Sequence, residues 1–379
     1  MIDKPHKNIL ILSDPPSAPG YMPRVRYLCE YLVRNGYQVT WITEEYQPLL
    51  FEHSYSIISI PMYSGGIVDW AIKTIWTLLT NWHNRAFGYK VLNLKSINKE
   101  WDLVLCSTFS DFPLIAAQQI SEQLNIPLLC DIRDLYEQVD NSQYQYKHKS
   151  WWLMPFRKIY NSIHINQRNK VLRKADAITA ISPWHAKFIR QFNPNTHLVY
   201  NGFDDKQFYP EDIKTDKFTI TYIGNLYDWQ LPALQRVKQV IKELNLPIQL
   251  DIHHPTHNSI PHDLLGDAIR RSGIMLVLTS PETHGMLTTK FYEALGCEKP
   301  ILCVPSDNGA LAELIEHTNA GIATDDQWQI KTFIIEKYNE WKKSGYTHQK
   351  TRYRSDFSRE AQSQQIEDII QQLLLKHTT

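Results

Sequence analysis

Short apolar runs alternate with segments of helical periodicity along the first part of the chain. Residues 8–12 form an apolar run, a proline-rich loop follows, and apolar positions at helical spacing then continue up to Gly36. A second apolar run occupies residues 39–42. The order strand, helix, strand predicts a βαβ unit, which builds parallel sheets with crossover helices.

The alternation continues to about residue 200 and then starts again. Further strands of the first half are predicted at residues 103–106, 126–130, 177–181 and 198–200, with a helix at 112–124. Polar residues and prolines at 203–217 predict a linker. Strands of the second half are predicted at residues 218–223, 248–252, 274–278 and 300–304. We therefore expect an α/β protein with two Rossmann-like, doubly wound domains facing a cleft, where such sheets bind ligands.

The domain boundaries follow from this pattern. We expect an N-terminal domain at residues 1–205 and a C-terminal domain at 206–355, with residues 356–379 crossing back to the first domain. A helix at about residues 358–375 has an apolar face that needs a surface to cover. That face consists of Ile366, Ile369, Ile370, Leu373 and Leu374.

Composition narrows the class of protein. The 379 residues are too many for one ordinary core, and Lys plus Arg balance Asp plus Glu at 40 each. A zero formal charge argues against a dedicated nucleic-acid binder. The five cysteines lie in apolar surroundings without metal-site or disulfide spacing, which predicts a cytoplasmic protein. No apolar stretch approaches the ~18 residues that a membrane span needs, and no secretory signal is recognised.

The most informative segment is residues 281–300. A loop of small and polar residues runs into a helix, so free backbone N–H groups and the positive end of the helix dipole favour a diphosphate there. Lys290 lies in the first turn and Glu293 one turn later, where its carboxylate can accept hydrogen bonds from ribose hydroxyls. The candidate donor-site residues of this loop are Gly285, Met286, Leu287, Thr288 and Thr289. The alternative is an ordinary amphipathic helix with Lys290 and Glu293 on its surface.

Residues 289–302 resemble the donor-site motif of the retaining glycosyltransferases of family four, which have the GT-B fold. The resemblance implies that Lys290 and Glu293 contact the nucleotide sugar, with Glu293 on the ribose. The family often has another glutamate eight residues before the second, and Gly285 stands there in this chain. Glu282 or backbone groups near Gly285 and Met286 are then expected to replace it.

Other blocks match the family in the same order. Residues 222–230 are similar to the strand, glycine and loop that begin its C-terminal domain, which makes Gly224, Asn225 and Gln230 donor-site candidates. Residues 175–182 and 199–204 resemble its interdomain approach, and residues 127–135 its N-domain strand and cleft loop. Where the family has a pair of glycines near its N-terminus, this chain has the single Gly20, followed by Arg24. The Arg/Lys pair of the second domain and the histidine of the N-domain sugar site are absent from the matching positions.

The resemblance implies a retaining hexosyltransferase that uses a UDP-, GDP- or dTDP-sugar. Its acceptor is expected to be a glycan or a lipid-linked glycan, in cell-surface polysaccharide synthesis such as lipopolysaccharide or capsule. The leaving diphosphate would be stabilised by the helix N-terminus, Lys290 and Arg24. Candidates that position sugar or acceptor hydroxyls are Asp111, Asp131, Arg133 and Asp134, whose alternative role is a structural ion-pair cluster. No cofactor and no metal are expected.

Residues 67–95 and 147–174 mix aromatic side chains with lysines and arginines. This mixture suits a bilayer interface with anionic lipid, and it predicts peripheral association with the inner face of the membrane. The alternative is a pair of amphipathic helices that pack on the core and expose a solvated basic side.

Two other functions remain open from the sequence. A sugar-nucleotide epimerase would have the same two-domain layout and would need acid/base residues, for which His253, His254 and His257 are the nearest candidates. The departures from the family pattern are also consistent with a non-catalytic partner subunit of another glycosyltransferase.

Overall fold

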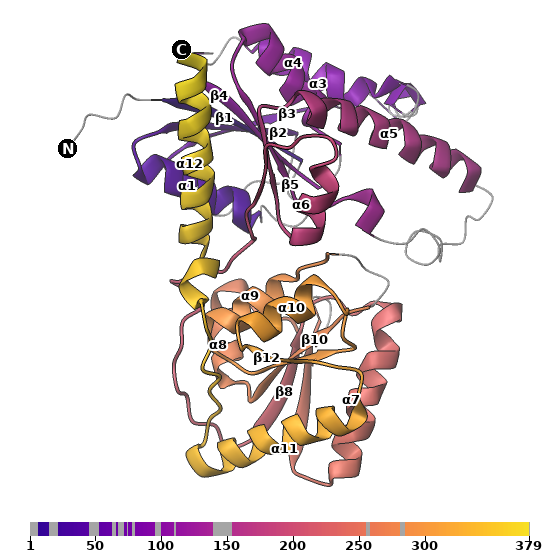
Figure 1. The fold of residues 1–379 in the computed structure, drawn as a ribbon, viewed down its shortest axis with the longest axis vertical. Helices are drawn as coiled ribbons and strands as arrows, with labels where there is room; N and C mark the ends of the chain where they lie inside the picture. Colours follow the sequence, from indigo (N-terminus) through magenta and orange to yellow (C-terminus); the bar gives the residue numbers. More distant parts are fainter. Residues whose placement is uncertain are drawn as a thin grey trace. The chain divides into compact units, whose positions relative to one another are not determined.

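The chain divides into two compact units, each a parallel sheet with helices on both faces (Figure 1). The first unit comprises Met1–Val199 and Ser363–Thr379, and the second comprises Tyr200–Gln362. The computed structural model describes residues 7–14, 22–44, 53–62, 66, 72–73, 75–77, 80–94, 100–109, 111–138, 154–254, 258–280 and 285–378.

The sheet of the first unit has the strand order β3-β2-β1-β4-β5-β6-β7, and every neighbouring pair is parallel. Its strands are β1 (Asn8–Ser13), β2 (Gln38–Glu44), β3 (Ser56–Ile60), β4 (Leu103–Thr108), β5 (Leu128–Ile132), β6 (Ala177–Ala180) and β7 (Thr196–Leu198). The chain builds outward from β1 in one direction and then from β4 in the other. The strand order therefore reverses between β1 and β4, which is the point where doubly wound sheets bind ligands.

Alternating residues of the central strands pack against different helices. Leu10, Leu12 and Val104 belong to one core, whose helices are α3 (Trp82–Leu92), α4 (Leu114–Leu124), α5 (Met154–Lys174) and α6 (Pro183–Ile189). Ile9 and Ile11 point to the other face, covered by α1 (Pro23–Arg34) and α12 (Arg359–Thr378). The period of two along each strand thus fills two separate cores.

The C-terminal helix α12 lies against α1 (Figure 1). The Tyr31 hydroxyl of α1 lies 2.8 Å from the Glu367 carboxylate of α12, and Ile366, Ile370 and Leu373 are buried beside α1. The apolar face of this helix was predicted from its spacing, and the packing confirms it.

The sheet of the second unit has the order β12-β11-β10-β8-β9, again parallel throughout. Its strands are β8 (Phe218–Ile223), β9 (Ile248–His253), β10 (Ile274–Leu278), β11 (Ile301–Val304) and β12 (Gly321–Ala323). One core contains α8 (Leu265–Arg271), α9 (Thr289–Gly296) and α10 (Ala310–His317), and the other contains α7 (Leu231–Leu244) and α11 (Gln327–Ser344). Here the order reverses between β8 and β10.

The doubly wound α/β fold was predicted, with local differences. β7 ends at Leu198, where the prediction started, and the short strands β3 and β12 were not predicted. β5 extends beyond Cys130 to Ile132, so Asp131 is a strand residue with a buried side chain rather than part of a polar loop. Hydrophobicity alone ended the strand too early, because a charged side chain can point inward when a partner charge meets it there.

No helix among the described residues is long and apolar enough to cross a membrane.

Candidate functional site

In the second unit, the carboxyl end of β8 meets the first turn of α9 at the reversal point of the sheet. Gly224 follows β8 with φ +127°, and a Cβ atom there would lie 2.9 Å from both Cε and Nζ of Lys290. The Lys290 ammonium also lies 5.4 Å from the centre of the Tyr222 ring. A side chain at position 224 would therefore displace the ammonium, so the glycine keeps room for it.

The start of α9 is shaped by the loop before it. Gly285 adopts a positive φ of 65°, Leu287 is buried, and the Thr288 side chain caps the helix by accepting from the Lys290 N–H. Met286 is half-buried and Thr289 is exposed. The Phe291 N–H donates to the Thr288 carbonyl at 3.2 Å, so Thr288 binds two of the first-turn N–H groups, and the dipole adds positive potential at this end.

Lys290 and Glu293 lie one turn apart on α9. Burial lowers the pKa of Lys290, and the nearby Glu293 opposes this effect. Burial raises the pKa of Glu293, against the charges of Arg359 and Lys290. Neither residue forms an ion pair closer than 4 Å with any part of the chain that the structure describes. Both charges thus stand close together in the first two turns of α9, without a tight counter-ion among the described residues.

Gln230 and Asn225 play different parts in the neighbouring loop. The Gln230 side chain is buried and donates to the Leu278 carbonyl at 2.9 Å, while its oxygen accepts from the Tyr227 N–H at 2.9 Å. Gln230 therefore ties the loop to the end of β10. Asn225 is exposed, and its carbonyl accepts from the Tyr222 hydroxyl at 2.5 Å.

In the first unit, Asp131 is fully engaged with protein groups. Arg24 donates to both of its oxygens, at 3.0 and 2.8 Å, and Ser107 and Thr179 add hydrogen bonds of 2.7 and 2.6 Å. Burial would raise the pKa of Asp131, but the Arg24 charge and these hydrogen bonds prevail and lower it to about 2. Arg24 also donates to the Val199 carbonyl at 3.2 Å. The pair joins the start of α1 to β5.

Arg133 lies at the reversal point of this sheet. It pairs with Asp14, which follows β1, and its guanidinium lies 3.7 Å from the centre of the Phe109 ring, which follows β4. Its Nε is buried and makes no hydrogen bond with the described residues. The ends of β1, β4 and β5 thus bring one acid, one aromatic ring and one guanidinium together.

Asp134 follows Arg133 and is half-buried. Burial raises the pKa of Asp134 to about 6, although a hydrogen bond from Gln138 at 3.0 Å and the charge of Arg133 oppose this. A carboxyl group with this pKa changes its charge near neutral pH. It can accept a hydrogen bond from a substrate hydroxyl above that pH and donate one below it.

Asp111 lies apart from these groups. The buried carboxylate accepts from Asn81 at 2.8 Å and pairs with His164 of α5, while Asn84 of α3 donates to the Asp111 carbonyl at 2.8 Å. These contacts join α3, α4 and α5.

The structure brings the remaining predicted residues together only in part. Lys290, Glu293, Gly224 and the 285–289 loop meet in the second unit, whereas Asp131, Arg133 and Asp134 meet in the first. Gly20 and Glu282 lie outside the described residues. Asp14, Gln138 and His185 were not singled out from the sequence. Of these three residues, only Asp14 had a recognisable signal in the sequence, because an acidic residue directly after a strand lies at the carboxyl edge of the sheet, where ligands bind.

The residues predicted to face a membrane differ in their exposure to solvent. Ile72, Ile75 and Trp76 are more than half exposed, at 51, 56 and 54%. Arg168 was grouped with the surface cations, but it is buried and pairs in bidentate fashion with Glu137, at 2.9 and 2.7 Å. Its charge is therefore neutralised inside the unit. The described part of the chain does not include Trp70, Lys95, Trp151 or Trp152.

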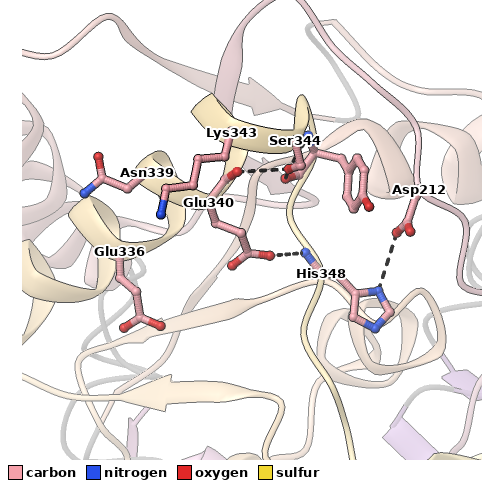
Figure 2. Close-up of a pocket in the computed structure, with 8 residues that line it drawn as sticks. Asp212, Glu336, Asn339, Glu340, Lys343, Ser344 and His348 are labelled. Carbon is pink, nitrogen blue, oxygen red and sulfur yellow. Dashed lines mark hydrogen bonds and ion pairs between the residues drawn. The ribbon is translucent and has the colours of Figure 1, made fainter.

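A further hollow of about 690 Å³ lies elsewhere in the second unit (Figure 2). It is lined by residues of α11 such as Glu336 and Lys343, and by His348, whose backbone N–H donates to Glu340 at 2.7 Å. Figure 2 shows the His348 ring turned toward Asp212, 3.5 Å away. None of the predicted donor-site residues lines this hollow.

Solved structures with the same fold span almost the whole chain. Sucrose-phosphate synthase from Thermosynechococcus elongatus superposes with a TM-score of 0.71 at 17% identity, covering 98% of this chain and all of the other. HepE from Anabaena in complex with UDP and glucose gives 0.65 at 15% identity, covering 97% and 100%. Its complex with UDP-glucose gives 0.62 at 14% identity, with the same coverage. At these identities the similarity establishes the GT-B-like fold.

A search of curated proteins found no significant match to the sequence. The family comparison does give one: residues 23–207 match the model of Glycosyltransferase Family 4. This match agrees with the motif resemblance in the second half and with the fold of both units. The matched segment lies in the N-terminal part of the chain, which is therefore similar to the glycosyltransferases of family 4.

Proposed function

We propose that the donor diphosphate binds where β8 meets the first turn of α9, between Gly224 and Lys290, and that Glu293 accepts hydrogen bonds from the ribose. The observation that carries this proposal is the half-buried Lys290 side chain, whose ammonium forms no ion pair with a described residue and faces Gly224, where a side chain would collide with it. A desolvated cation without a protein partner is unfavourable unless an anion neutralises it. A diphosphate supplies that charge.

The same arrangement suits the chemistry of glycosyl transfer. When the bond between the anomeric carbon and the donor phosphate breaks, negative charge grows on the leaving diphosphate. The Lys290 ammonium and the positive end of the α9 dipole lie beside the place proposed for that charge, so little reorganisation is needed during the reaction. We propose a UDP-sugar as the donor, because the HepE structures with the same fold are complexes with UDP, glucose and UDP-glucose.

We propose that hydroxyl groups of the acceptor or the transferred sugar are bound by Asp134 and Arg133, at the reversal point of the first sheet. Asp134 has the elevated pKa and Arg133 a buried Nε without a described partner. Arg24 and Asp131 are assigned a supporting role, because their charges neutralise each other and fix β5 against α1.

The donor site is tested by thermal unfolding with UDP, UDP-glucose, GDP-mannose and dTDP-glucose. A ligand at about one hundred times its Kd adds about 2.7 kcal/mol to the stability of the native state. We expect UDP-glucose to raise the Tm of the native chain and of Lys238→Met, an exposed α7 control, and to leave the Tm of Lys290→Met unchanged. An equal rise in Lys290→Met would remove the diphosphate from this site.

We further propose that the acceptor is a lipid-linked glycan of cell-surface polysaccharide synthesis, and that the enzyme reaches it from an anionic membrane surface. Support comes from the exposed Ile72, Ile75 and Trp76, which flank Lys73. Apolar and aromatic side chains with neighbouring cations favour the bilayer interface.

Sedimentation with phosphatidylserine vesicles at low salt tests this surface. We expect binding by the native protein and by Trp328→Ser, whose exposed tryptophan belongs to α11, and weaker binding by Trp76→Ser. Equal sedimentation of the two variants, or no binding by the native protein, would reject the membrane proposal and leave the donor site unaffected.

A further inference from the structure

A chain of side-chain hydrogen bonds connects Asp134 to Ser182 through Gln138 and His185. The Gln138 amide nitrogen donates to Asp134 Oδ1 at 3.0 Å, and its oxygen lies 2.6 Å from His185 Nε2. His185 Nδ1 lies 2.9 Å from the Ser182 hydroxyl. Gln138, His185 and Ser182 are all buried. We call these three residues the relay.

The hydrogen-bonding capacity of each group fixes the direction of the relay. The Gln138 oxygen only accepts, so His185 carries its proton on Nε2. Burial lowers the pKa of His185 to about 4, against the charge of Glu137, so the ring is neutral near pH 7. Its Nδ1 then accepts from the Ser182 hydroxyl. Every donor in the relay points toward Asp134.

Both ends of the relay are held by neighbouring helices. Arg168 of α5 binds Glu137 in bidentate fashion, which fixes the short helix η1 (Tyr136–Gln138). Ser182 caps α6, because its side chain also accepts from the His185 N–H at 3.2 Å. Within the described residues, Asp134 Oδ2 accepts no hydrogen bond, so it is free to meet a ligand hydroxyl.

We propose that His185 is a positioning residue, which acts through Gln138 to fix the Asp134 carboxylate for a hydrogen bond from a hydroxyl of the acceptor or the transferred sugar. The contact between Asp134 and substrate rests on the proposed function, whereas the relay itself does not. A ring that only filled space would need neither both nitrogens engaged nor a glutamine held between two partners.

Loss of the relay has a defined consequence for Asp134. Two charged groups act on the pKa of Asp134: Arg133 beside it opposes the effect of burial, and Asp14 after β1 adds to it. The Gln138 hydrogen bond stabilises the ionised carboxylate. A freely rotating Gln138 would donate less often, so the pKa of Asp134 would rise and the carboxylate would be lost at a higher pH.

The test compares His185→Asn, too short to reach Gln138, with His185→Gln, which can still donate near the Nε2 position. His197→Asn is the control, because His197 bonds only to Asn195 among the described side chains and lies on β7. Carboxyl ¹³C NMR titration, with the Asp134 signal assigned from Asp134→Asn, measures the pKa directly. We expect a rise of about one pH unit in His185→Asn, with His185→Gln and the control near the native value.

Activity provides the second readout, as UDP release from UDP-glucose. For folded His185→Asn we expect the acid limb of the kcat profile to move by the same amount, kcat to fall about tenfold and the KM for UDP-glucose to stay within about twofold. An unchanged Asp134 titration, or ¹⁵N spectra with the His185 proton on Nδ1, would overturn the relay. A shifted titration with an unshifted kcat profile would overturn the positioning role.

The failures of the two proposals are distinguishable. If the native protein neither binds nor cleaves UDP-glucose, the proposed donor is wrong, and the NMR titration still decides whether the relay controls Asp134. If His185→Asn does not fold, Gln138→Met in place of it breaks the same link, and an unchanged Asp134 pKa in that variant would again overturn the relay.

Discussion

The charged groups that lie near the carboxyl edges of the two sheets are neutralised differently. In the first unit, Arg24 pairs with Asp131 and Arg133 pairs with Asp14. In the second unit, Lys290 and Glu293 stand near each other and form no tight ion pair with the described residues. Paired charges indicate architecture, whereas a cation left without a tight partner at a helix N-terminus indicates a place for an anionic ligand.

Two groups of the first unit are exceptions: the Arg133 Nε, which forms no hydrogen bond with the described residues, and the carboxyl group of Asp134. Asp134 lies beside paired charges, yet burial raises its pKa to about 6 while one oxygen is held by Gln138. The first unit therefore combines a frame of ion pairs, Arg24 with Asp131 and Arg133 with Asp14, with one carboxyl group whose charge changes near neutral pH. In the second unit, the charges that we propose to bind the donor lie in the first two turns of α9.

Asp131→Asn is expected to have the largest effect on stability. It leaves the buried Arg24 guanidinium without its counter-charge, which should lower the free energy of unfolding by about 3–5 kcal/mol in urea titrations. The matched control is Glu122→Gln, which breaks an exposed pair with Lys174 and should cost less than about 1 kcal/mol. Equal costs would contradict the view of Arg24 and Asp131 as the frame.

The pKa of Asp131 gives this prediction a pH signature. Because folding lowers the pKa from 3.8 to about 2, the ionised carboxylate contributes stability above about pH 4, and that contribution is lost as the pH falls toward 2. Its size is about 2 kcal/mol. Native protein should lose this amount between those pH values relative to Asp131→Asn.

In the second unit, we expect Glu293→Gln to change ligand affinity strongly and stability little. Because burial raises the pKa of Glu293, the neutral amide removes a strained charge, and the free energy of unfolding should stay within about 0.5 kcal/mol or increase. Affinity for UDP-glucose, measured by isothermal titration, should fall about tenfold through the lost ribose contact. Glu316→Gln, on an exposed position of α10, should change neither quantity. A large loss of stability with unchanged affinity would show that Glu293 has a structural role instead of binding the ligand.

The smallest effect concerns protons taken up with the donor. Burial lowers the pKa of Lys290, so a fraction of the ammonium groups is deprotonated at alkaline pH, and a bound diphosphate favours the charged form. UDP binding should therefore take up part of a proton as the pH rises toward that pKa, and affinity should decline there. Calorimetry in buffers of different ionisation enthalpy measures this uptake, which should be absent in Lys290→Met if that variant binds at all. Equal uptake in both proteins would assign the proton to another group.

Hydrophobic periodicity predicted the strands that form the centre of each sheet, because those strands are apolar on both faces. It missed β3, whose residues are mostly exposed or half-buried, and β12, which has three residues and begins with a glycine. These two edge strands lack the signal of a buried strand, whereas the edge strand β9 was predicted from its alternating apolar residues.

The site was predictable where its signal is local. Lys290, Glu293 and the loop before them occupy one short segment, and a helix start is readable from such a segment. Asp14 lies 119 positions from Arg133, and Gln138 lies 47 from His185, so these pairs exist only after folding. For the same reason the sequence did not distinguish Asp131, which is neutralised by Arg24, from Asp134, which forms no ion pair with the described residues.

The most direct test is a crystal structure of the protein with UDP-glucose bound. The account predicts the diphosphate within hydrogen-bonding distance of Lys290 Nζ and of the first N–H groups of α9, with the ribose hydroxyls on Glu293. A nucleotide bound elsewhere, with Lys290 still facing Gly224 and no phosphate beside it, would contradict the account.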